Sequence, residues 1–413
     1  MSTKPKAKTT PKDEVLEPTT ETDPRVQMAK YLNRTKDDHY NLTKTVPPFR
    51  ISTGSLNLDM EILGFSQGAH RVVGGPALGK TPFTLNVIDT FLDEVPGSRA
   101  VWCKAEGRFS ERNMARARHP LVISSDDWVA GTILIFKNNV YEAWIDMMRD
   151  LVMNNPTGCR YAFVTDSLNN MILRNDRSKP TDEASRVAGA PMLTSQMFQR
   201  MGQALNELGH IAFFLSQVTA EIKLNPYDKT PPRQGSSSGG NSIAHNANET
   251  LEFLNWYEGD LILKNPDERL NRITNPALGH ILKVKIQKSS SEKRYVTVEI
   301  PIRYGVNEGS AIWCEREVGD QMLGWQLISK TNPSKVKEGA APAEPKKGGS
   351  WLYVSPQLAA ELAQQGMEPL PEKIQGLNQL YALLEERRDV TQYLYRRFRD
   401  MIAGTTTASP AAA

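Results

Sequence analysis

The chain has 413 residues, and its 50 Lys and Arg against 47 Asp and Glu give a net charge of +3, which excludes a uniformly basic nucleic-acid binder but allows local basic segments. Its three widely spaced cysteines contain no C-x-x-C pair, which excludes a disulfide scaffold and a cysteine-based zinc site and is typical of a reducing cytoplasm. No run approaches about 18 apolar residues and no apolar segment follows the basic N-terminus, so we expect a soluble chain with no membrane helix and no signal peptide.

The N-terminal region contains two kinds of segment. Residues 1–24 are rich in Lys, Thr, Pro and Glu, and they offer too few apolar groups for a core, so we predict a disordered tail. Residues 25–50 contain a short helical pattern, with Val26, Ala29 and Leu32, before Val46-Pro47-Pro48. This segment is too small to fold alone, and we predict an arm that docks on another surface.

From Ile51 to about residue 305, apolar runs alternate with helical segments. The predicted strands are 71–73, 100–103, 133–136, 161–165 and 211–215, and the predicted helices include 82–95, 141–153 and 190–208. Several of these strands are almost continuously apolar, as expected for strands buried on both faces. Two alternating runs, 281–286 and 295–302, predict an antiparallel hairpin at the sheet edge. The pattern indicates an α/β fold with a mostly parallel sheet.

The C-terminal region begins after Gly305. A helical stretch is followed by a linker rich in Pro, Lys, Gly and Ala at 331–349, and then by a compact helical segment at 351–402. We therefore assign 51–305 to a core, 306–404 to a C-terminal domain with a flexible insert at 331–349, and 405–413 to a second disordered tail. We expect Trp144 and Trp351 to lie in the apolar core rather than in a ligand site.

The strongest motif in the chain is a glycine-rich segment between a predicted strand and a predicted helix. Its residues are Gly74-Gly75-Pro76-Ala77-Leu78-Gly79-Lys80-Thr81, which match G-x-x-x-x-G-K-[ST], and Pro82 follows in the first helical turn. Glycines let backbone N–H groups converge on phosphate oxygens, and the helix adds its positive N-terminal end. Lys80 would neutralise the β- and γ-phosphates and Thr81 would bind Mg²⁺. The motif favours nucleotide binding over a glycine-rich structural turn.

Two acidic residues follow predicted strands and are candidates for the same site. Asp166 comes directly after the apolar run 161–165, and we expect it to help organise Mg²⁺. Glu106 follows the strand 100–103, and we expect it to orient or deprotonate an attacking water. Ligands of such sheets bind beyond the carboxyl ends of the strands, where both residues would lie. An ordinary strand end for Asp166 and a solvated surface position for Glu106 are the alternatives.

The segment Ile51-Ser52-Thr53-Gly54-Ser55-Leu56-Asn57-Leu58-Asp59 closely resembles the RecA family of DNA recombinases. Further matching pieces follow in the same order: Ala105-Glu106 at the family's catalytic glutamate, Thr165-Asp166-Ser167 at its magnesium-site strand end, Ser195-Gln196, Gln217, Gly239-Gly240-Asn241, Arg303-Tyr304-Gly305 and Gly349-Ser350-Trp351. The resemblance covers roughly residues 26–402. It rests on the order of the matching pieces, which is the same as in the family. It implies a divergent bacterial or phage member located in the bacterial cytoplasm.

The resemblance implies a RecA-type ATPase core with an N-terminal polymerisation arm and a small C-terminal α/β domain. Subunits would self-associate into a helical filament with ATP and Mg²⁺ between them. Gln217 would sense the γ-phosphate, and Lys288 of a neighbouring subunit would act like an arginine finger. The family's second basic position matches Ser290 or a residue nearby, where Lys293 or Arg294 would have to substitute. An ordinary solvated lysine is the alternative for Lys288.

Two loops are candidates for binding DNA. The long segment 218–239 is rich in Pro, Ser, Gly and Lys, which suits single-stranded DNA held without sequence readout. We expect Lys223, Lys229 and Arg233 to contact phosphates, Ile222 and Tyr227 to contact bases, and Gly239, Gly240 and Asn241 to close the loop. A second loop, 173–189, carries Arg174, Arg177, Lys179 and Arg186. Both positions match the family's two DNA-binding loops, but Met192 stands where the family has a basic residue. Solvated charge is the alternative for each loop residue.

The C-terminal helix also carries a basic set, which consists of Arg387, Arg388, Arg396, Arg397 and Arg399. It is interpreted either as a guide for double-stranded DNA or as a charged exposed helix face, and we favour the second.

Together these features predict an ATP-dependent recombinase that forms helical filaments on single-stranded DNA, pairs it with a homologous duplex and catalyses strand exchange. One alternative is a RecA-core ring helicase or motor, which the short N-terminal arm and the lysine at 288 disfavour. The other is a nucleotide-binding filament or accessory DNA-binding protein with little hydrolysis. The departures at Ser290 and Met192 keep this alternative open.

Overall fold

The structure is a computed structural model. It describes residues 24–34, 48–107, 109–155, 157–177, 189–218, 243, 245–291, 293–306, 309–330 and 351–404. The chain divides into two units, 1–45 and 46–413. The first unit contains helix α1 (Pro24–Arg34), which falls in the stretch with the predicted helical pattern. The predicted insert and C-terminal tail, and all of the predicted N-terminal tail except Pro24, lie outside the described residues.

The second unit is built on a ten-stranded sheet. Its strands are β3 (Gly68–Gly74), β4 (Arg99–Lys104), β5 (Leu121–Val122), β6 (Ile133–Phe136), β7 (Tyr161–Asp166), β8 (Ile211–Gln217), β9 (Glu249–Phe253), β10 (Leu261–Leu263), β11 (Ala277–Lys288) and β12 (Thr297–Arg303). They follow the order β10-β11-β9-β3-β8-β7-β4-β6-β5, with β12 also paired to β11. All pairs from β9 to β5 are parallel. The α/β class and the mostly parallel sheet are as predicted.

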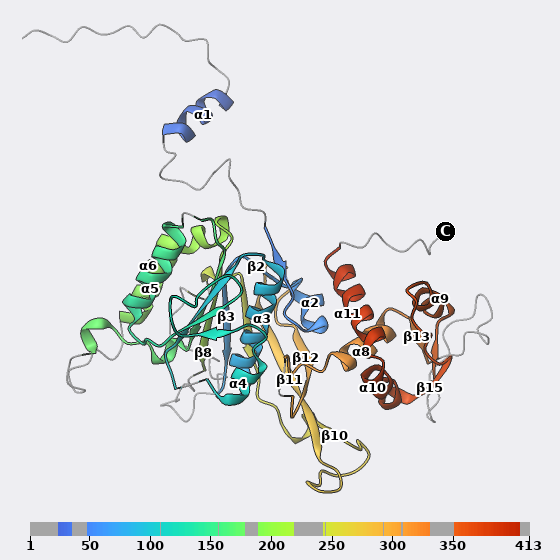
Figure 1. Cartoon of the computed structure of the whole chain (residues 1–413). Coiled ribbons are helices and arrows are strands. Elements are labelled where there is room, and N and C mark those ends of the chain that lie inside the picture. The colour runs from blue at the N-terminus through green and yellow to red at the C-terminus, as the bar shows by residue number, and fades with distance from the viewer. Residues whose placement is uncertain are drawn as a thin grey trace, which may run out of the picture. The chain divides into compact units, whose positions relative to one another are not determined.

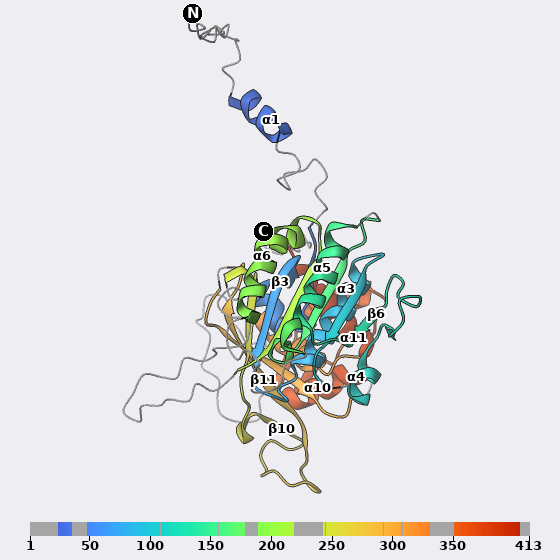
Figure 2. The same cartoon turned by 90° about the vertical axis from the view of Figure 1, so that its left-hand side faces the viewer.

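Helices cover both faces of this sheet, which explains why its strands are so apolar. The helices of this part are α2 (Leu56–Ile62), α3 (Lys80–Glu94), α4 (Glu111–Arg116), α5 (Tyr141–Met153) and α6 (Gly189–Glu207), with short 3-10 turns at Leu168–Asn170, Arg174–Asp176 and Glu258–Asp260. Neighbouring residues of β8 face opposite sides: Phe213 joins the cluster under α3, whereas the ring of Phe214 lies 5.6 Å from that of Phe198 on α6. Trp144 of α5 packs on Phe163 of β7 and is fully buried, as predicted. Figures 1 and 2 show α5 and α6 side by side on one side of the sheet.

The predicted hairpin of β11 and β12 forms and is antiparallel. Its predicted place at the sheet edge is wrong for β11, which pairs with β9 and β10 as well as with β12. Strand β11 is twelve residues long, so different parts of it serve different neighbours. Its alternating pattern reflects burial at every second residue, and such a pattern does not distinguish an edge strand from a shared one.

The C-terminal part contains a small sheet as well as helices. Its elements are α8 (Cys314–Gly324), β13 (Ile328–Ser329), β14 (Trp351–Val354), α9 (Pro356–Gln364), β15 (Lys373–Gln375), α10 (Gly376–Glu386) and α11 (Arg388–Ile402). Strands β13, β14 and β15 form an antiparallel sheet, so the helical pattern predicted for 351–402 missed two strands. A small α/β C-terminal part is what the resemblance implied. The strands are too short for an alternating pattern to stand out. Trp351 is 45% exposed, not buried, because its neighbour Leu352 faces inward and adjacent strand residues point to opposite faces.

The C-terminal part packs on the segment that precedes β3. That segment contains the short strands β1 (Arg50–Ile51) and β2 (Phe65–Ser66), which pair antiparallel around α2. Leu56 belongs to the apolar cluster of the C-terminal part. The buried Glu317 of α8 accepts hydrogen bonds from the Ser55 hydroxyl at 2.5 Å and from the Leu56 N–H at 2.8 Å, and burial raises its pKa to about 8. In the described part of the chain, no helix is both long and apolar enough to cross a membrane.

Candidate functional site at the carboxyl edge of the sheet

The glycine-rich loop, residues 74–81, joins the end of β3 to the start of α3. Gly79 precedes the helix with a φ of 84°, a conformation that favours glycine. Gly74 lies so close to the next strand that a Cβ atom there would be 2.8 Å from the carbonyl oxygen of Phe253. Because the helix begins at Lys80, its free N–H groups and positive dipole end lie at the loop. This is the strand-loop-helix context that the motif requires.

Lys80 is folded toward its own loop. Its Nζ donates to the carbonyl oxygens of Gly74 at 3.0 Å and Gly75 at 2.7 Å. Burial lowers the pKa of this lysine, while the carboxylates of Asp166 and Glu106 act in the opposite direction. The ammonium group is therefore bound by the loop backbone and lies close enough to the two predicted acidic residues to interact with their charges.

The register of the sheet brings the ends of four strands together. Gly74 of β3 pairs directly with Gln217 of β8, and Asp166 of β7 pairs with Lys104 of β4. Strand β8 lies between β3 and β7, so Gln217 ends between the loop and Asp166. The Ala105 N–H donates to the Asp166 carbonyl oxygen at 2.8 Å, which continues the ladder by one residue and leads to Glu106. Glu106 and Asp166 therefore lie at the same sheet edge, as expected from the strand ends.

Glu106 is held by amide and hydroxyl groups through one of its two carboxylate oxygens. Its Oε2 accepts hydrogen bonds from Ser167 Oγ at 3.3 Å, from Gln217 Nε2 at 3.5 Å and from Asn170 Nδ2. None of the described residues donates a hydrogen bond to Oε1. A carboxylate fixed through one oxygen, with the other free to accept, can orient a water molecule.

Asp166 is paired with a lysine that the sequence patterns did not single out. Its Oδ2 accepts a hydrogen bond from Thr81 Oγ1 at 3.2 Å and lies 2.7 Å from Lys104 Nζ, and both charged side chains are almost fully buried. The hydroxyl of Thr81 and the carboxylate of Asp166 are donors of the kind that Mg²⁺ prefers. The charge does not fit, because the Lys104 ammonium already balances the Asp166 carboxylate.

A cavity of about 350 Å³ lies beside the glycine-rich loop. Its walls include Ala77, Leu78 and Gly79 of the loop, Arg112 and Arg116 of α4, and Leu282, Ile300, Ile302, His280 and Tyr304 of the β11–β12 region. The rings of His280 and Tyr304 lie 5.5 Å apart, and burial lowers the pKa of His280, so its ring is neutral at pH 7. An apolar space with two aromatic rings and basic groups at its wall suits a purine nucleoside. From the sequence, Tyr304 was expected only at the boundary of the C-terminal domain.

The predicted Lys288 is not near the loop of its own chain. In the sheet, Lys288 of β11 lies opposite Thr250 of β9, and Thr250 lies opposite Arg71 of β3, three residues before Gly74. Its Nζ donates to the His245 carbonyl oxygen at 2.6 Å, and burial lowers its pKa. A role at a nucleotide therefore requires the loop of another subunit.

Of the three residues weighed for a second basic finger, Ser290 and Lys293 are engaged in their own chain, whereas Arg294 is exposed. The hydroxyl of Ser290 donates to Glu249 Oε1 at 2.6 Å, and Lys293 pairs with Glu61 at 2.9 Å.

Only two of the predicted DNA-binding residues fall within the described part of the chain. Arg174 and Arg177 are exposed, and Arg174 lies 3.6 Å from Asp146 of α5. The others lie outside the described residues: Lys179, Arg186, Ile222, Lys223, Tyr227, Lys229, Arg233, Gly239, Gly240 and Asn241.

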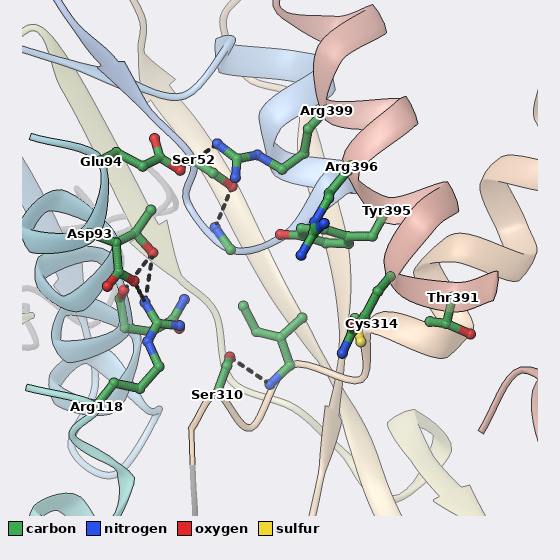
Figure 3. Close-up of a pocket in the computed structure, with 15 residues that line it drawn as sticks. Ser52, Asp93, Glu94, Arg118, Ser310, Cys314, Thr391, Tyr395, Arg396 and Arg399 are labelled. Carbon is green, nitrogen blue, oxygen red and sulfur yellow. Dashed lines mark hydrogen bonds and ion pairs between the residues drawn. The ribbon is translucent and has the colours of Figure 1, made fainter. Parts of the chain in front are cut away.

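The basic set near the C-terminus is largely engaged in ion pairs. Arg387 pairs with Asp389, Arg397 with Glu361, and Arg399 with Glu94 of α3. Figure 3 shows Arg399 reaching toward Glu94 across a cavity of about 390 Å³, with Arg118 and Asp93 on the far wall. Three of the five arginines are thus engaged within the chain, and neither interpretation from the sequence included these ion pairs.

Sequence reasoning missed Lys104 and the two asparagines after β7. Asn169 Oδ1 accepts the Gln217 N–H at 2.8 Å, and Asn170 contacts Glu106. Lys104 ends the strand that leads to Glu106, so its place at this edge could have been inferred from the same rule. Comparison of the chain with models of known protein families and with curated proteins finds no match.

Proposed function

We propose that this protein is an ATPase whose nucleotide-bound state binds single-stranded DNA and acts in DNA strand exchange. The observation that carries the proposal is the convergence of the glycine-rich loop, Glu106 and Gln217 at one edge of the parallel sheet. A loop that can bind phosphate, a carboxylate that can orient water and an amide between them are the parts that phosphoryl transfer to water requires.

Each described residue has a distinct role in this proposal. The loop N–H groups, the start of α3 and Lys80 bind the β- and γ-phosphates. The base occupies the cavity at His280 and Tyr304. Glu106, held through Oε2, orients the attacking water with Oε1 and takes its proton. Mg²⁺, where it is bound with ATP, would be held by Thr81 and would add positive charge at the phosphates.

In this proposal, Gln217 couples the nucleotide site to DNA binding. This residue ends β8, and the long segment expected to bind DNA follows it. A γ-phosphate that contacts the Gln217 amide would alter its hydrogen bond with Glu106 at the end of β8, from which the segment expected to bind DNA continues. The resemblance to the RecA family supports single-stranded DNA as the primary ligand, double-stranded DNA as the second substrate, and a helical filament in which Lys288 reaches the ATP of a neighbouring subunit.

One contact favours a second candidate function, a nucleotide-binding DNA-filament protein with little hydrolysis. The Lys104 ammonium on Asp166 reduces the negative charge that would attract a divalent ion to the site. A weakly held ion would leave the transition state of hydrolysis less stabilised.

The test is steady-state ATP hydrolysis by the full chain with and without single-stranded DNA. We expect hydrolysis that DNA stimulates, and we expect Lys80→Ala to abolish it because the phosphates lose their lysine. Lys285→Ala is the matched control, since Lys285 lies on β11 near the Tyr295 ring and outside the site. Bound ATP that stays intact over hours with DNA present would favour the second candidate. No ATP binding, or wild-type hydrolysis in the Lys80→Ala variant, would overturn the proposal.

A further inference from the structure

The Lys104 ammonium occupies the place beside Thr81 and Asp166 where the sequence predicts Mg²⁺. Its Nζ lies 2.7 Å from Asp166 Oδ2, the same oxygen that accepts the Thr81 hydroxyl. The lysine is 8% exposed and the aspartate 3% exposed. The ammonium also lies 5.6 Å from the centre of the Phe109 ring, a distance at which a cation is attracted to the ring face. The Lys104 ammonium is therefore held by two neighbours, the Asp166 carboxylate and the Phe109 ring.

We propose that Lys104 is the resident cation of this nucleotide site, and that it lets the chain bind ATP almost as tightly without Mg²⁺ as with it. The inference rests on the proposed ATP site and names a positioning residue within it. Lys104 acts through Asp166, because it cancels the negative charge that would otherwise repel the phosphates of ATP.

The charges around the loop support this role. Lys104 pairs with Asp166, and Lys80 interacts electrostatically with Asp166 and Glu106. Two further cations, Arg112 and Arg116, line the cavity beside the loop. Without Lys104, the buried Asp166 carboxylate would lose its ion-pair partner, and Lys80 alone would have to offset the charges of Asp166 and Glu106. Interactions between charges are only weakly screened at such buried positions.

A divalent ion and the Lys104 ammonium compete for the same oxygen. A Mg²⁺ ion bound by the Thr81 hydroxyl and the Asp166 carboxylate would need Asp166 Oδ2 as a ligand. The Lys104 ammonium is already at hydrogen-bond distance from that oxygen. Binding of Mg²⁺ would displace Lys104 from a buried ion pair, which carries a cost. The same contact thus predicts both a weak Mg²⁺ requirement for ATP binding and a weak affinity for Mg²⁺ alone.

The experiment measures the dissociation constant of ATP for the full chain in MgCl2 and in EDTA. For the wild type we expect the two constants to agree within about tenfold. For Lys104→Met we expect ATP affinity in EDTA to fall by the order of tenfold to a hundredfold, with a much smaller loss in MgCl2. Lys104→Arg keeps the charge and should retain the wild-type ratio of the two constants.

A second variant separates the charge effect from a folding defect. Lys104→Met with Asp166→Asn removes both charges at similar size, so this double variant should again bind ATP in EDTA nearly as it does in MgCl2. In a direct metal readout, MgCl2 without nucleotide should raise the melting temperature of Lys104→Met more than that of the wild type, since only the variant offers an unpaired carboxylate.

The outcomes distinguish this inference from the function on which it rests. If the wild type binds ATP in neither buffer, the proposed function fails and this inference fails with it. If the wild type binds ATP in MgCl2 but loses more than about a hundredfold in EDTA, the inference alone is overturned. It is also overturned if Lys104→Met and the wild type show the same ratio of dissociation constants.

Discussion

The side-chain amide of Gln217 lies 3.5 Å from Glu106 Oε2, so the last residue of β8 contacts the carboxylate proposed to activate water. The backbone of Gln217 is held in turn by Asn169. Gln217 is therefore positioned to report the state of the site to the segment that follows β8.

Replacing Gln217 by Ala should uncouple DNA from hydrolysis. We expect the stimulation of ATP hydrolysis by single-stranded DNA to be lost, because the amide that joins Glu106 to the end of β8 is gone. The affinity for ADP should stay within about twofold of wild type, since an amide lost from outside the phosphate loop costs binding little. Hydrolysis rates with and without DNA test this, with Gln199→Ala on the exposed side of α6 as the control. Normal stimulation in the Gln217→Ala variant would contradict the coupling.

Replacing Glu106 by Gln should slow hydrolysis without preventing ATP binding. We expect kcat to fall by about a hundredfold or more, which is the usual contribution of a general base. Asn170→Ala should cause a smaller fall, because Asn170 only positions the carboxylate. Single-turnover hydrolysis and ATP binding, measured on both variants, test whether Glu106→Gln slows hydrolysis more than Asn170→Ala does while both still bind ATP. A kcat for Glu106→Gln close to that of the wild type would show that another group activates the water.

Replacing Tyr304 by Ala should weaken binding of the base but not of the phosphates. Stacking of a base on an aromatic ring is worth about 1–3 kcal/mol, so we expect the dissociation constant for ATP to rise about tenfold. Inorganic tripolyphosphate lacks the base, and its binding should not change. Competition binding with both ligands tests this. An equal loss for the two ligands would place the base outside the cavity of about 350 Å³ beside the loop.

The buried Glu317 should make stability depend on pH. Burial raises its pKa from the usual 4.5 to about 8, so the folded chain keeps a proton that the unfolded chain releases between these values. The free energy of unfolding should therefore fall as pH rises from about 4.5 to about 8, by a few kcal/mol at most, and this group should add no further change above about pH 8.

Glu317→Gln isolates this effect from that of Asp59, whose pKa burial also raises. The amide can still accept from the Leu56 N–H and can donate to Ser55, so the variant should fold and should lose the Glu317 part of the slope. Urea unfolding of both proteins at several pH values measures it. Parallel curves for the two proteins would show that Glu317 does not hold its proton in the folded chain.

Much of the core could be predicted from sequence, because its strands are apolar on both faces and its helices amphipathic. The predicted strand 133–136 and helix 141–153 match β6 and α5 at both ends. The residue patterns missed the strands of the C-terminal sheet, since β14 and β15 have only four and three residues, too few for an alternating pattern to stand out.

The candidate site was predictable where a rule fixes position along the chain. Glu106 and Asp166 were expected at one edge because parallel strands end together. The side-chain contacts at that edge could not be predicted: the ion pair of Lys104 with Asp166 depends on the register of β4 against β7, which sequence patterns do not reveal. The cavity at Tyr304 likewise depends on how β12 pairs with β11 beside the loop.

The central claim is that nucleotide bound at the glycine-rich loop controls DNA binding. The most direct measurement is the fluorescence anisotropy of a labelled single-stranded oligonucleotide titrated with the full chain, in the presence of a non-hydrolysable ATP analogue, of ADP, or of no nucleotide. We expect tight binding with the analogue and at least about tenfold weaker binding in the other two conditions, as expected when a ligand favours one of two states. Equal DNA affinity in all three conditions, or no binding in any, would contradict the claim.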